Sequence, residues 1–197
     1  MRTLISAFMM FVAVGWAQPP GDKPPTILIA YYSSQGHTRA MAEAVARGAS
    51  AVPGAAVRIK VVADVAEKDL LDADAIIVGS PVYNANVAPQ VQEFINRWPF
   101  RGAPMRDKIG GAFVTGGGIS TGEELVQLSI LHSMLVFGMI VVGGPEWTSA
   151  FGASAVVEEG PFKHSGGATV DSLFLSKGEA LGKRVASLAT RLKGDRR

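Results

Sequence analysis

Residues 26–50 constrain the fold of this chain most, because they predict a strand, a short polar loop and a helix in immediate succession. An apolar run ends at Ser33-Ser34-Gln35-Gly36-His37-Thr38, and a helical pattern begins there, with Met41, Val45 and Ala49 on one face. A strand–loop–helix start of this kind is typical of doubly wound α/β proteins. We therefore expect an α/β fold in which this loop is a candidate binding site.

The loop between strand and helix carries the groups that bind a phosphate. A helix N-terminus offers unpaired N–H donors, and the helix dipole favours an anion there. Ser33, Ser34 and Thr38 add hydroxyl groups, and Gly36 allows close approach of the backbone. The loop contains no lysine, which excludes the G-x-x-x-x-G-K-[ST] nucleotide loop and favours the phosphate of a tightly bound cofactor. The alternative interpretation is that Ser and Thr only cap the helix.

Composition excludes several classes of function. The 197 residues suffice for one α/β domain, and a net charge of +2 is not typical of a nucleic-acid-binding protein. Cysteine is absent, which excludes disulfides, thiolate metal sites and cysteine nucleophiles. The histidines His37, His132 and His164 do not have metal-ligand spacing, so no metal site is expected.

The N-terminus predicts export. Residues 1–17 combine Arg2, an apolar stretch at residues 4–14 and small residues before a cleavage site after Ala17, as in a Sec-type signal peptide. Residues 18–25 predict an extended, Pro-rich leader. We therefore expect a periplasmic or secreted protein without a stable membrane span after cleavage. An uncleaved anchor and a misassigned start codon are the alternatives.

Residues 26–194 predict one three-layer α/β sandwich. A five-stranded parallel sheet is expected from apolar runs at residues 27–32, 57–62, 75–79, 112–115 and 139–143. Helices are expected at residues 38–51, 68–72, 88–98, 123–137 and 177–192. The run at residues 57–62 alternates, with Arg58 and Lys60 on one face, which indicates an edge strand. Right-handed crossovers favour the strand order 2-1-3-4-5.

In this strand order, the loops after strands one, three and four form one site. The first loop is the phosphate loop, the second spans residues 80–87, and the third, at residues 115–122, contains three consecutive glycines. The second loop carries the aromatic ring of Tyr83 beside the amide of Asn84. Together, the three loops indicate a flat, hydrogen-bonding heterocycle with a phosphate tail.

At these loops the chain resembles flavodoxin-like FMN proteins, and among them the NAD(P)H:quinone oxidoreductase family typified by tryptophan-repressor-binding protein. The family's Y-Y-S-x-x-G-H motif is matched by residues 31–37, and its G-[ST]-P motif by residues 79–81. Its glycine-rich stretch, and the G-M pair after the following helix, are matched by residues 115–122 and 138–139. Phe137 stands where the family has histidine, and residues 63–73 replace a longer insertion.

The resemblance implies an FMN enzyme with NAD(P)H as donor, a quinone-like acceptor, a homo-oligomeric state and no catalytic side chain. It implies that the phosphate is held by Ser33, Ser34, Gln35, Gly36, His37 and Thr38. It implies that the second loop flanks the flavin through Pro81, Val82, Tyr83 and Asn84. The third loop would offer N–H groups from Thr115, Gly116, Gly117, Gly118 and Ile119. Trp98 is a candidate for the rim of the substrate pocket, and a core contact at the end of its helix is the alternative.

Two other functions remain open on the sequence. A flavodoxin that carries single electrons would have the same fold, although such carriers are usually acidic and this chain has a pI near 9.0. A serine hydrolase would use Gly118-Ile119-Ser120-Thr121-Gly122 as a G-x-S-x-G elbow, with Glu158 or Glu159 and His164 completing a triad.

Overall fold

The computed structural model describes residues 23–163 and 169–195, which form alternating strands and helices. The strands are β1 (Thr26–Tyr31), β2 (Ala56–Val61), β3 (Ala75–Tyr83), β4 (Asn86–Val87), β5 (Ile109–Gly116), β6 (Ile140–Val141) and β7 (Ala153–Val156). The helices are α1 (His37–Ser50), α2 (Glu67–Asp72), α3 (Pro89–Asn96), α4 (Glu123–Val136) and α5 (Ser172–Asp195). Short 3₁₀ turns are η1 (Val62–Asp64) and η2 (Trp147–Ser149). The expected signal peptide, and the leader as far as residue 22, lie outside the described residues.

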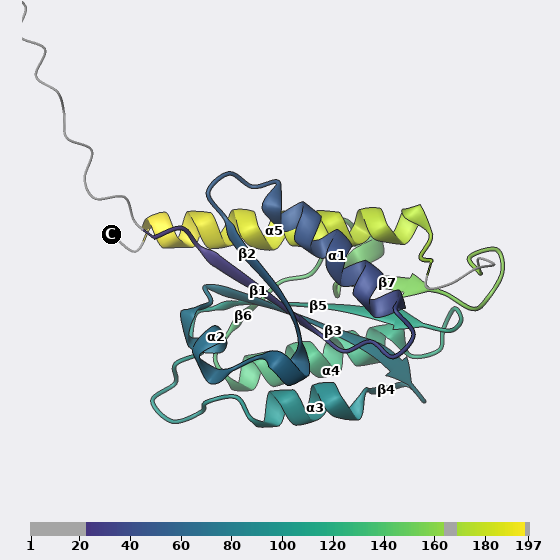
Figure 1. The fold of residues 1–197 in the computed structure, drawn as a ribbon, viewed down its shortest axis with the longest axis horizontal. Coiled ribbons are helices and arrows are strands. Elements are labelled where there is room, and N and C mark those ends of the chain that lie inside the picture. Colours follow the sequence, from purple (N-terminus) through teal and green to yellow (C-terminus); the bar gives the residue numbers. More distant parts are fainter. Residues whose placement is uncertain (1–22, 164–168, 196–197) are drawn as a thin grey trace, which may run out of the picture.

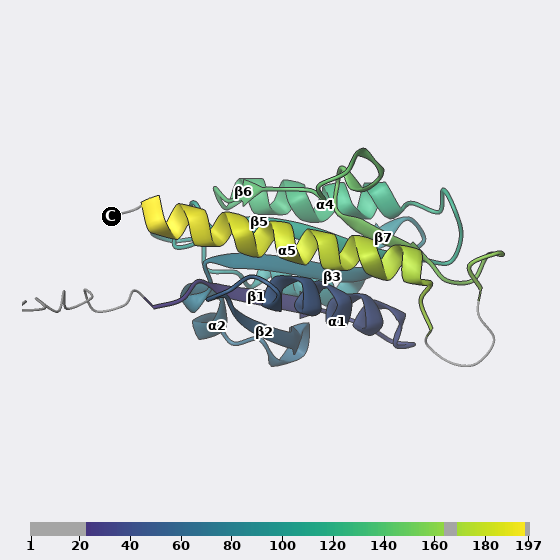
Figure 2. The same ribbon diagram turned by 90° about the horizontal axis from the view of Figure 1, so that it is seen from above.

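The described residues form a three-layer sandwich, as expected from the alternating pattern. Figures 1 and 2 show α1 and α5 on one face of the sheet and α3 and α4 on the other. Each face has its own apolar core, and all six residues of β1 are buried between the two. Gly48 and Gly182 lie at the contact between α1 and α5, where a Cβ would collide with the backbone of the facing helix. This close crossing needs glycine at both positions.

The parallel strands follow the order β2-β1-β3-β5, and the next position is shared by β6 and β7. This order agrees with the predicted 2-1-3-4-5, but of the strand predicted at residues 139–143 only the two residues of β6 are strand, and β7 completes its position beside β5. Ile140 pairs with Ile109 at the start of β5, whereas Ala153 pairs with Phe113 near its end. Between them the chain leaves the sheet at Gly143-Gly144-Pro145, because such a sequence disfavours a continued strand.

The sheet therefore has seven strands among the described residues, where the sequence predicted five. The additional element besides the split strand is β4, which pairs antiparallel with the end of β3. Asn84 and Ala85 form the tip of this hairpin with φ angles of 51° and 59°. Positive φ at both central residues is the signature of the tight hairpin turn whose twist matches that of the strands.

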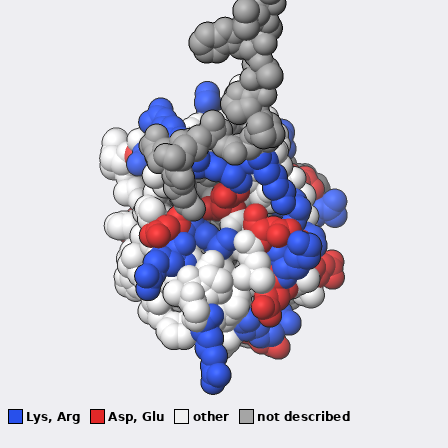
Figure 3. All heavy atoms as spheres, turned by 90° about the vertical axis from the view of Figure 1, so that its left-hand side faces the viewer, with Lys and Arg blue, Asp and Glu red and all other residues white. Residues whose placement is uncertain are grey.

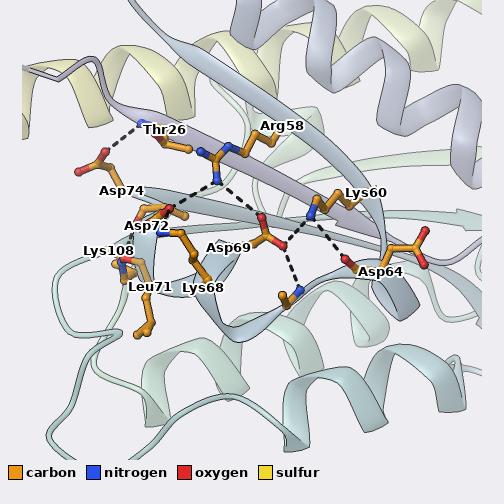
Figure 4. A network of polar contacts seen from close by, with 12 residues as sticks. Thr26, Arg58, Lys60, Asp64, Lys68, Asp69, Leu71, Asp72, Asp74 and Lys108 are labelled. Carbon is orange, nitrogen blue, oxygen red and sulfur yellow. Dashed lines mark hydrogen bonds and ion pairs between the residues drawn. The ribbon is translucent and has the colours of Figure 1, made fainter.

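The predicted edge strand β2 is confirmed, and it is tied to α2 by ion pairs (Figure 4). Asp69 Oδ2 lies 2.6 Å from Lys60 Nζ and also accepts a hydrogen bond of 2.9 Å from the N–H of Ala66. The guanidinium nitrogen Nη1 of Arg58 lies 3.6 Å from Asp69 Oδ1. The hydrogen bond from Lys60, followed by that from Ala66, lowers the pKa of Asp69. The opposite side of the strand is apolar, and Ile59 remains 40% exposed there.

The amino ends of the strands lie at the other end of the molecule from the predicted site. Figure 3 shows this end, where Lys and Arg side chains are interspersed with Asp and Glu. Among the described residues, no helix combines the length and apolar character that a membrane span requires.

Candidate cofactor-binding site

A pocket of about 440 Å³ lies at the carboxyl ends of β1, β3 and β5. It falls between β1 and β3, at the point where strand order reverses and where ligands bind in open α/β sheets. Its volume is within the range of small-molecule sites. It is lined by Ser33, Ser34, Gln35, His37, Thr38, Pro81, Val82, Tyr83, Asn84, Ala85, Thr115, Gly116, Gly117, Thr121, Val157 and Glu158.

The first loop is shaped around the N-terminus of α1. Gly36 has a φ of 95°, and its N–H donates a hydrogen bond of 3.0 Å to Ser33 Oγ. The first bond of the helix runs from the N–H of Ala40 to the carbonyl of Gly36, at 2.9 Å. The N–H groups of His37 and Thr38 therefore have no acceptor within the helix. Since neither Lys nor Arg lines the pocket, an anion here would be held by neutral donors and the helix dipole.

A buried pair of hydroxyl groups joins the first loop to the third. Thr38 Oγ1 and Thr115 Oγ1 lie 2.8 Å apart, and both residues are buried. Thr38 is at the start of α1, whereas Thr115 is near the end of β5. The contact fixes the distance between the phosphate loop and the glycine-rich loop.

The second loop is the hairpin of β3 and β4, which brings an aromatic ring to the pocket. Ser80 Oγ donates to the carbonyl of Pro81 at 2.7 Å and accepts from the N–H of Ala88 at 3.0 Å, which holds the base of the hairpin. The hydroxyl of Tyr83 lies 2.8 Å from Ser34 Oγ. Tyr83 therefore bridges the second loop to the first across the pocket.

In the third loop, the main chain of two glycines, Gly116 and Gly117, lines the pocket without covering side chains. The carbonyls of Gly116 and Gly117 accept hydrogen bonds from the N–H groups of Val157 and Glu158, at 3.0 and 2.9 Å. A methyl group on Gly117 would lie 3.3 Å from Glu158 Oε2. The glycine at this position therefore leaves room for a flat ligand edge to approach the backbone.

Two of the residues predicted for the third loop's cofactor contacts, Gly118 and Ile119, are not among the residues that line the pocket. The N–H of Ile119 donates a hydrogen bond of 2.6 Å to Glu159 Oε2, and Gly118 lies beside the same carboxylate. This hydrogen bond corrects the expectation that Ile119 offers a free N–H group to the ligand. Thr121 Oγ1 donates to the carbonyl of Gly118 at 2.9 Å, and Thr121 itself lines the pocket.

Trp98 is not among the residues that line the pocket and lies in the core, as the alternative interpretation expected. It is only 4% exposed and packs with Phe94 and Phe137, at ring-centroid distances of 5.6 and 5.3 Å. Its place at the end of α3 puts it in the apolar layer under the sheet. The aromatic Phe137 that replaces the family's histidine is part of this same cluster.

Sequence reasoning missed Val157 and Glu158, which line the pocket directly after β7. Four of the five residues at 153–157 are apolar, which is compatible with a strand, but the fifth strand was predicted earlier in the chain. Among the described residues, no group of three His, Cys, Asp or Glu could hold a metal ion.

The hydrolase motif lies beside the pocket. Ser120 is exposed, has a φ of 62°, and lines a separate hollow with Glu123, Leu125 and Ser154. Of the proposed triad acids, Glu159 is bonded to the N–H of Ile119 and Glu158 faces the main pocket. His164 lies outside the described residues.

Comparison with known proteins gives matches along most of the chain. The family model of NADPH-dependent FMN reductases matches residues 62–154. A protein of Geotalea uraniireducens called NAD(P)H dehydrogenase (quinone) is 33% identical over 210 residues, covering 84% of this chain and 98% of the relative. A protein of Cupriavidus metallidurans with the same name is 37% identical over 143 residues, covering 60% and 70%.

Flavodoxins are also among the relatives and structural neighbours. A flavodoxin of Aquifex aeolicus is 34% identical over 137 residues, covering 64% of this chain and 72% of the relative. The crystal structure of a WrbA-like flavodoxin from Agrobacterium tumefaciens superposes with a TM-score of 0.69 at 24% identity, covering 85% of this chain and 98% of the other. This similarity shows that the fold is flavodoxin-like, as the sequence predicted.

Proposed function

This chain belongs to the flavodoxin-like family of FMN-dependent NAD(P)H:quinone oxidoreductases, and we propose that its pocket holds FMN and that it reduces a quinone with electrons from NAD(P)H. One observation supports this more than any other. A neutral phosphate cradle at α1, the aromatic hairpin after β3 and the glycine loop after β5 meet around a single pocket.

The chemistry of the lining residues fits FMN. The phosphate would lie against the free N–H groups of His37 and Thr38 and the hydroxyls of Ser33 and Ser34. The ring system would lie between Tyr83 and the backbone of Gly117. The pocket has both the polar end and the flat, glycine-lined end that this cofactor needs.

FMN, when bound, supplies the redox chemistry by accepting a hydride from a reduced nicotinamide and passing two electrons to the quinone. The protein residues position and shield the cofactor. Tyr83 covers the pocket and is held by Ser34, and the Thr38–Thr115 pair fixes the loops on either side. Backbone N–H groups of the part of the third loop that lines the pocket, at Gly116 and Gly117, would stabilise negative charge that develops on the adjacent ring edge. No lining side chain needs to act as a nucleophile.

Steady-state kinetics tests this proposal. FMN-loaded protein should oxidise NADH or NADPH only when a quinone such as benzoquinone is present, with one quinone reduced per nicotinamide. A protein that binds FMN but oxidises neither nicotinamide would support the alternative of a flavodoxin-type electron carrier, which the Aquifex relative's name favours. Such a carrier would instead exchange electrons with a redox protein.

We further propose that the protein is exported by a Sec-type signal in residues 1–17 and acts in the periplasm or outside the cell. N-terminal sequencing of the protein recovered from that compartment should begin at Gln18. Recovery of the full-length chain from the cytoplasm would contradict this location.

A further inference from the structure

The chain between β6 and β7, here called the edge loop (residues 142–152), leaves the sheet and folds back beside α4 (Figure 2). It is held by hydrogen bonds of its own, such as that from the N–H of Gly152 to the carbonyl of Ser149 at 3.0 Å. Helix α5 also holds the loop, since Lys177 Nζ donates to the carbonyl of Thr148 at 3.2 Å. The loop therefore presents its side chains at defined positions.

Two aromatic side chains of the edge loop are exposed. Trp147 is 89% exposed and Phe151 is 39% exposed. Together with residues of α4 and β7 they line a hollow of about 370 Å³, a volume within the range of small-molecule sites. None of the described residues that line this hollow also lines the cofactor pocket. The hollow is therefore a second candidate site.

Gln127 of α4 brings a buried side-chain amide to this hollow. The residue is 3% exposed, and its Nε2 forms no hydrogen bond within the described part of the chain. A buried amide without a partner is unfavourable, so groups of this kind are usually satisfied by water or a ligand. The terminal torsion of glutamine has broad preferences, and a rotation about it turns either Nε2 or Oε1 toward the hollow. Gln127 can therefore bind a polar atom of a ligand there.

A carboxylate lies one helical turn before this amide. Glu124 is exposed, lines the same hollow and forms no ion pair among the described residues. Residues three apart in a helix share a face, so Glu124 and Gln127 are neighbours on α4. Neither Lys nor Arg of the described chain lines the hollow, which disfavours an anionic ligand.

We propose that this hollow binds the base of adenosine or a similar planar heteroaromatic amine. Gln127 Nε2 donates to a ring nitrogen, and the exocyclic amino group next to that nitrogen donates to Glu124. A glutamine amide recognises a ring nitrogen and the adjacent amino group of adenine in the same way in protein–DNA complexes. The face of the base lies against the aromatic side chains of the edge loop, because nucleobases stack on such rings.

Isothermal titration calorimetry with adenosine as the probe tests the site. Excess FMN is included, so that a cofactor pocket that binds FMN is occupied; failure of that pocket to bind FMN leaves the expected result unchanged. One adenosine should bind per chain. Purine riboside lacks only the amino group and should bind at least about fivefold more weakly, because Glu124 then loses its partner. Absence of adenosine binding, or equal affinity for the two nucleosides, would overturn the proposal.

Variants locate the bound nucleoside. Gln127→Leu should weaken adenosine binding by about tenfold, while the melting temperature of the free protein stays the same or rises, because an unpartnered amide has been removed. Trp147→Ala should also weaken binding by about tenfold. Phe100→Ala is the matched control, since Phe100 is an aromatic residue that is 63% exposed and lines a different hollow.

The control variant should bind adenosine as the wild type does. Unchanged adenosine affinity in Trp147→Ala, or a loss of affinity in Phe100→Ala as large as that in Trp147→Ala, would contradict the site. Because Trp147 is on the surface, its variant tests the site even if Gln127→Leu does not fold. Circular dichroism of each variant confirms that the fold is retained.

Discussion

Thr38 Oγ1 and Thr115 Oγ1 lie 2.8 Å apart in a buried hydroxyl pair that joins residues 77 positions apart in the chain. Either hydroxyl can donate to the other. When Thr115 donates, the hydroxyl of Thr38 is free to donate into the pocket beside the N-terminus of α1. The pair therefore links the shape of the glycine loop to the binding of a phosphate.

The first prediction concerns this pair. Thr38→Val should weaken FMN binding by about 1.5–3 kcal/mol, because it removes a hydroxyl donor to a charged acceptor. Thr115→Val should weaken binding less, and the double variant should cost less than the sum of the two, since the hydroxyls act together. Quenching of FMN fluorescence gives the dissociation constants. Unchanged affinity in Thr38→Val would show that this hydroxyl does not reach the phosphate.

The second prediction concerns the aromatic ring in the hairpin. Tyr83→Ala should shift the absorption spectrum of bound flavin and lower its affinity, because an offset ring contact contributes about 0.5–1.5 kcal/mol beyond burial. Tyr83→Phe keeps the ring and loses only the contact with Ser34, so its spectrum should resemble that of the wild type. A normal flavin spectrum in Tyr83→Ala would place the cofactor away from this loop.

The third prediction separates folding from binding at the glycine loop. In Gly117→Ala, the nearest neighbour of the new methyl group is the end of a flexible side chain, Glu158, at 3.3 Å. The melting temperature should therefore change little. FMN affinity should fall markedly, because the methyl group occupies the space that the ring edge needs. Full affinity in Gly117→Ala would exclude close approach of the ring to this backbone.

The fourth prediction concerns acid stability and Asp69. Its lowered pKa means that, between the folded value and an unfolded value of about 3.9, the unfolded chain binds more protons. The contribution of Asp69 is therefore complete above about pH 4 and is lost as the pH falls through its folded pKa. Asp69→Asn should cost on the order of 1–3 kcal/mol at neutral pH, and less as the solution becomes more acidic.

Urea unfolding at several pH values measures the effect of Asp69→Asn. Glu43→Gln is the control, because it breaks an exposed pair with Arg39 within α1 and should leave the stability nearly unchanged at every pH. An equal loss of stability in Asp69→Asn at neutral and acidic pH would show that the carboxylate charge is not the cause.

The sequence predicted the features that depend on local pattern. The start of α1 at the polar loop, the buried central strands and the edge position of β2 all follow from residue periodicity. Most of the residues predicted for the cofactor site line one pocket in the structure. They lie together because the loops that follow parallel strands all lie at the same edge of the sheet.

The predictions that differ from the structure concern residues whose positions are set by tertiary contacts rather than by local sequence. Residues 153–156 pair with β5 after the chain has left the sheet at residues 143–145, and the pairing partner of a returning segment is set by tertiary contacts rather than by its local sequence. Trp98 ends a helix near the expected rim, but packing with Phe94 and Phe137 places it in the core. The N–H of Ile119 is engaged by Glu159, which lies 40 residues further along the chain.

The stoichiometry of bound FMN tests the central claim most directly. Protein purified without added cofactor should be yellow, and denaturation should release close to one FMN per chain. Protein purified without flavin should quench the fluorescence of added FMN until one equivalent is bound. Colourless protein that neither releases flavin nor quenches added FMN would contradict the assignment of this pocket.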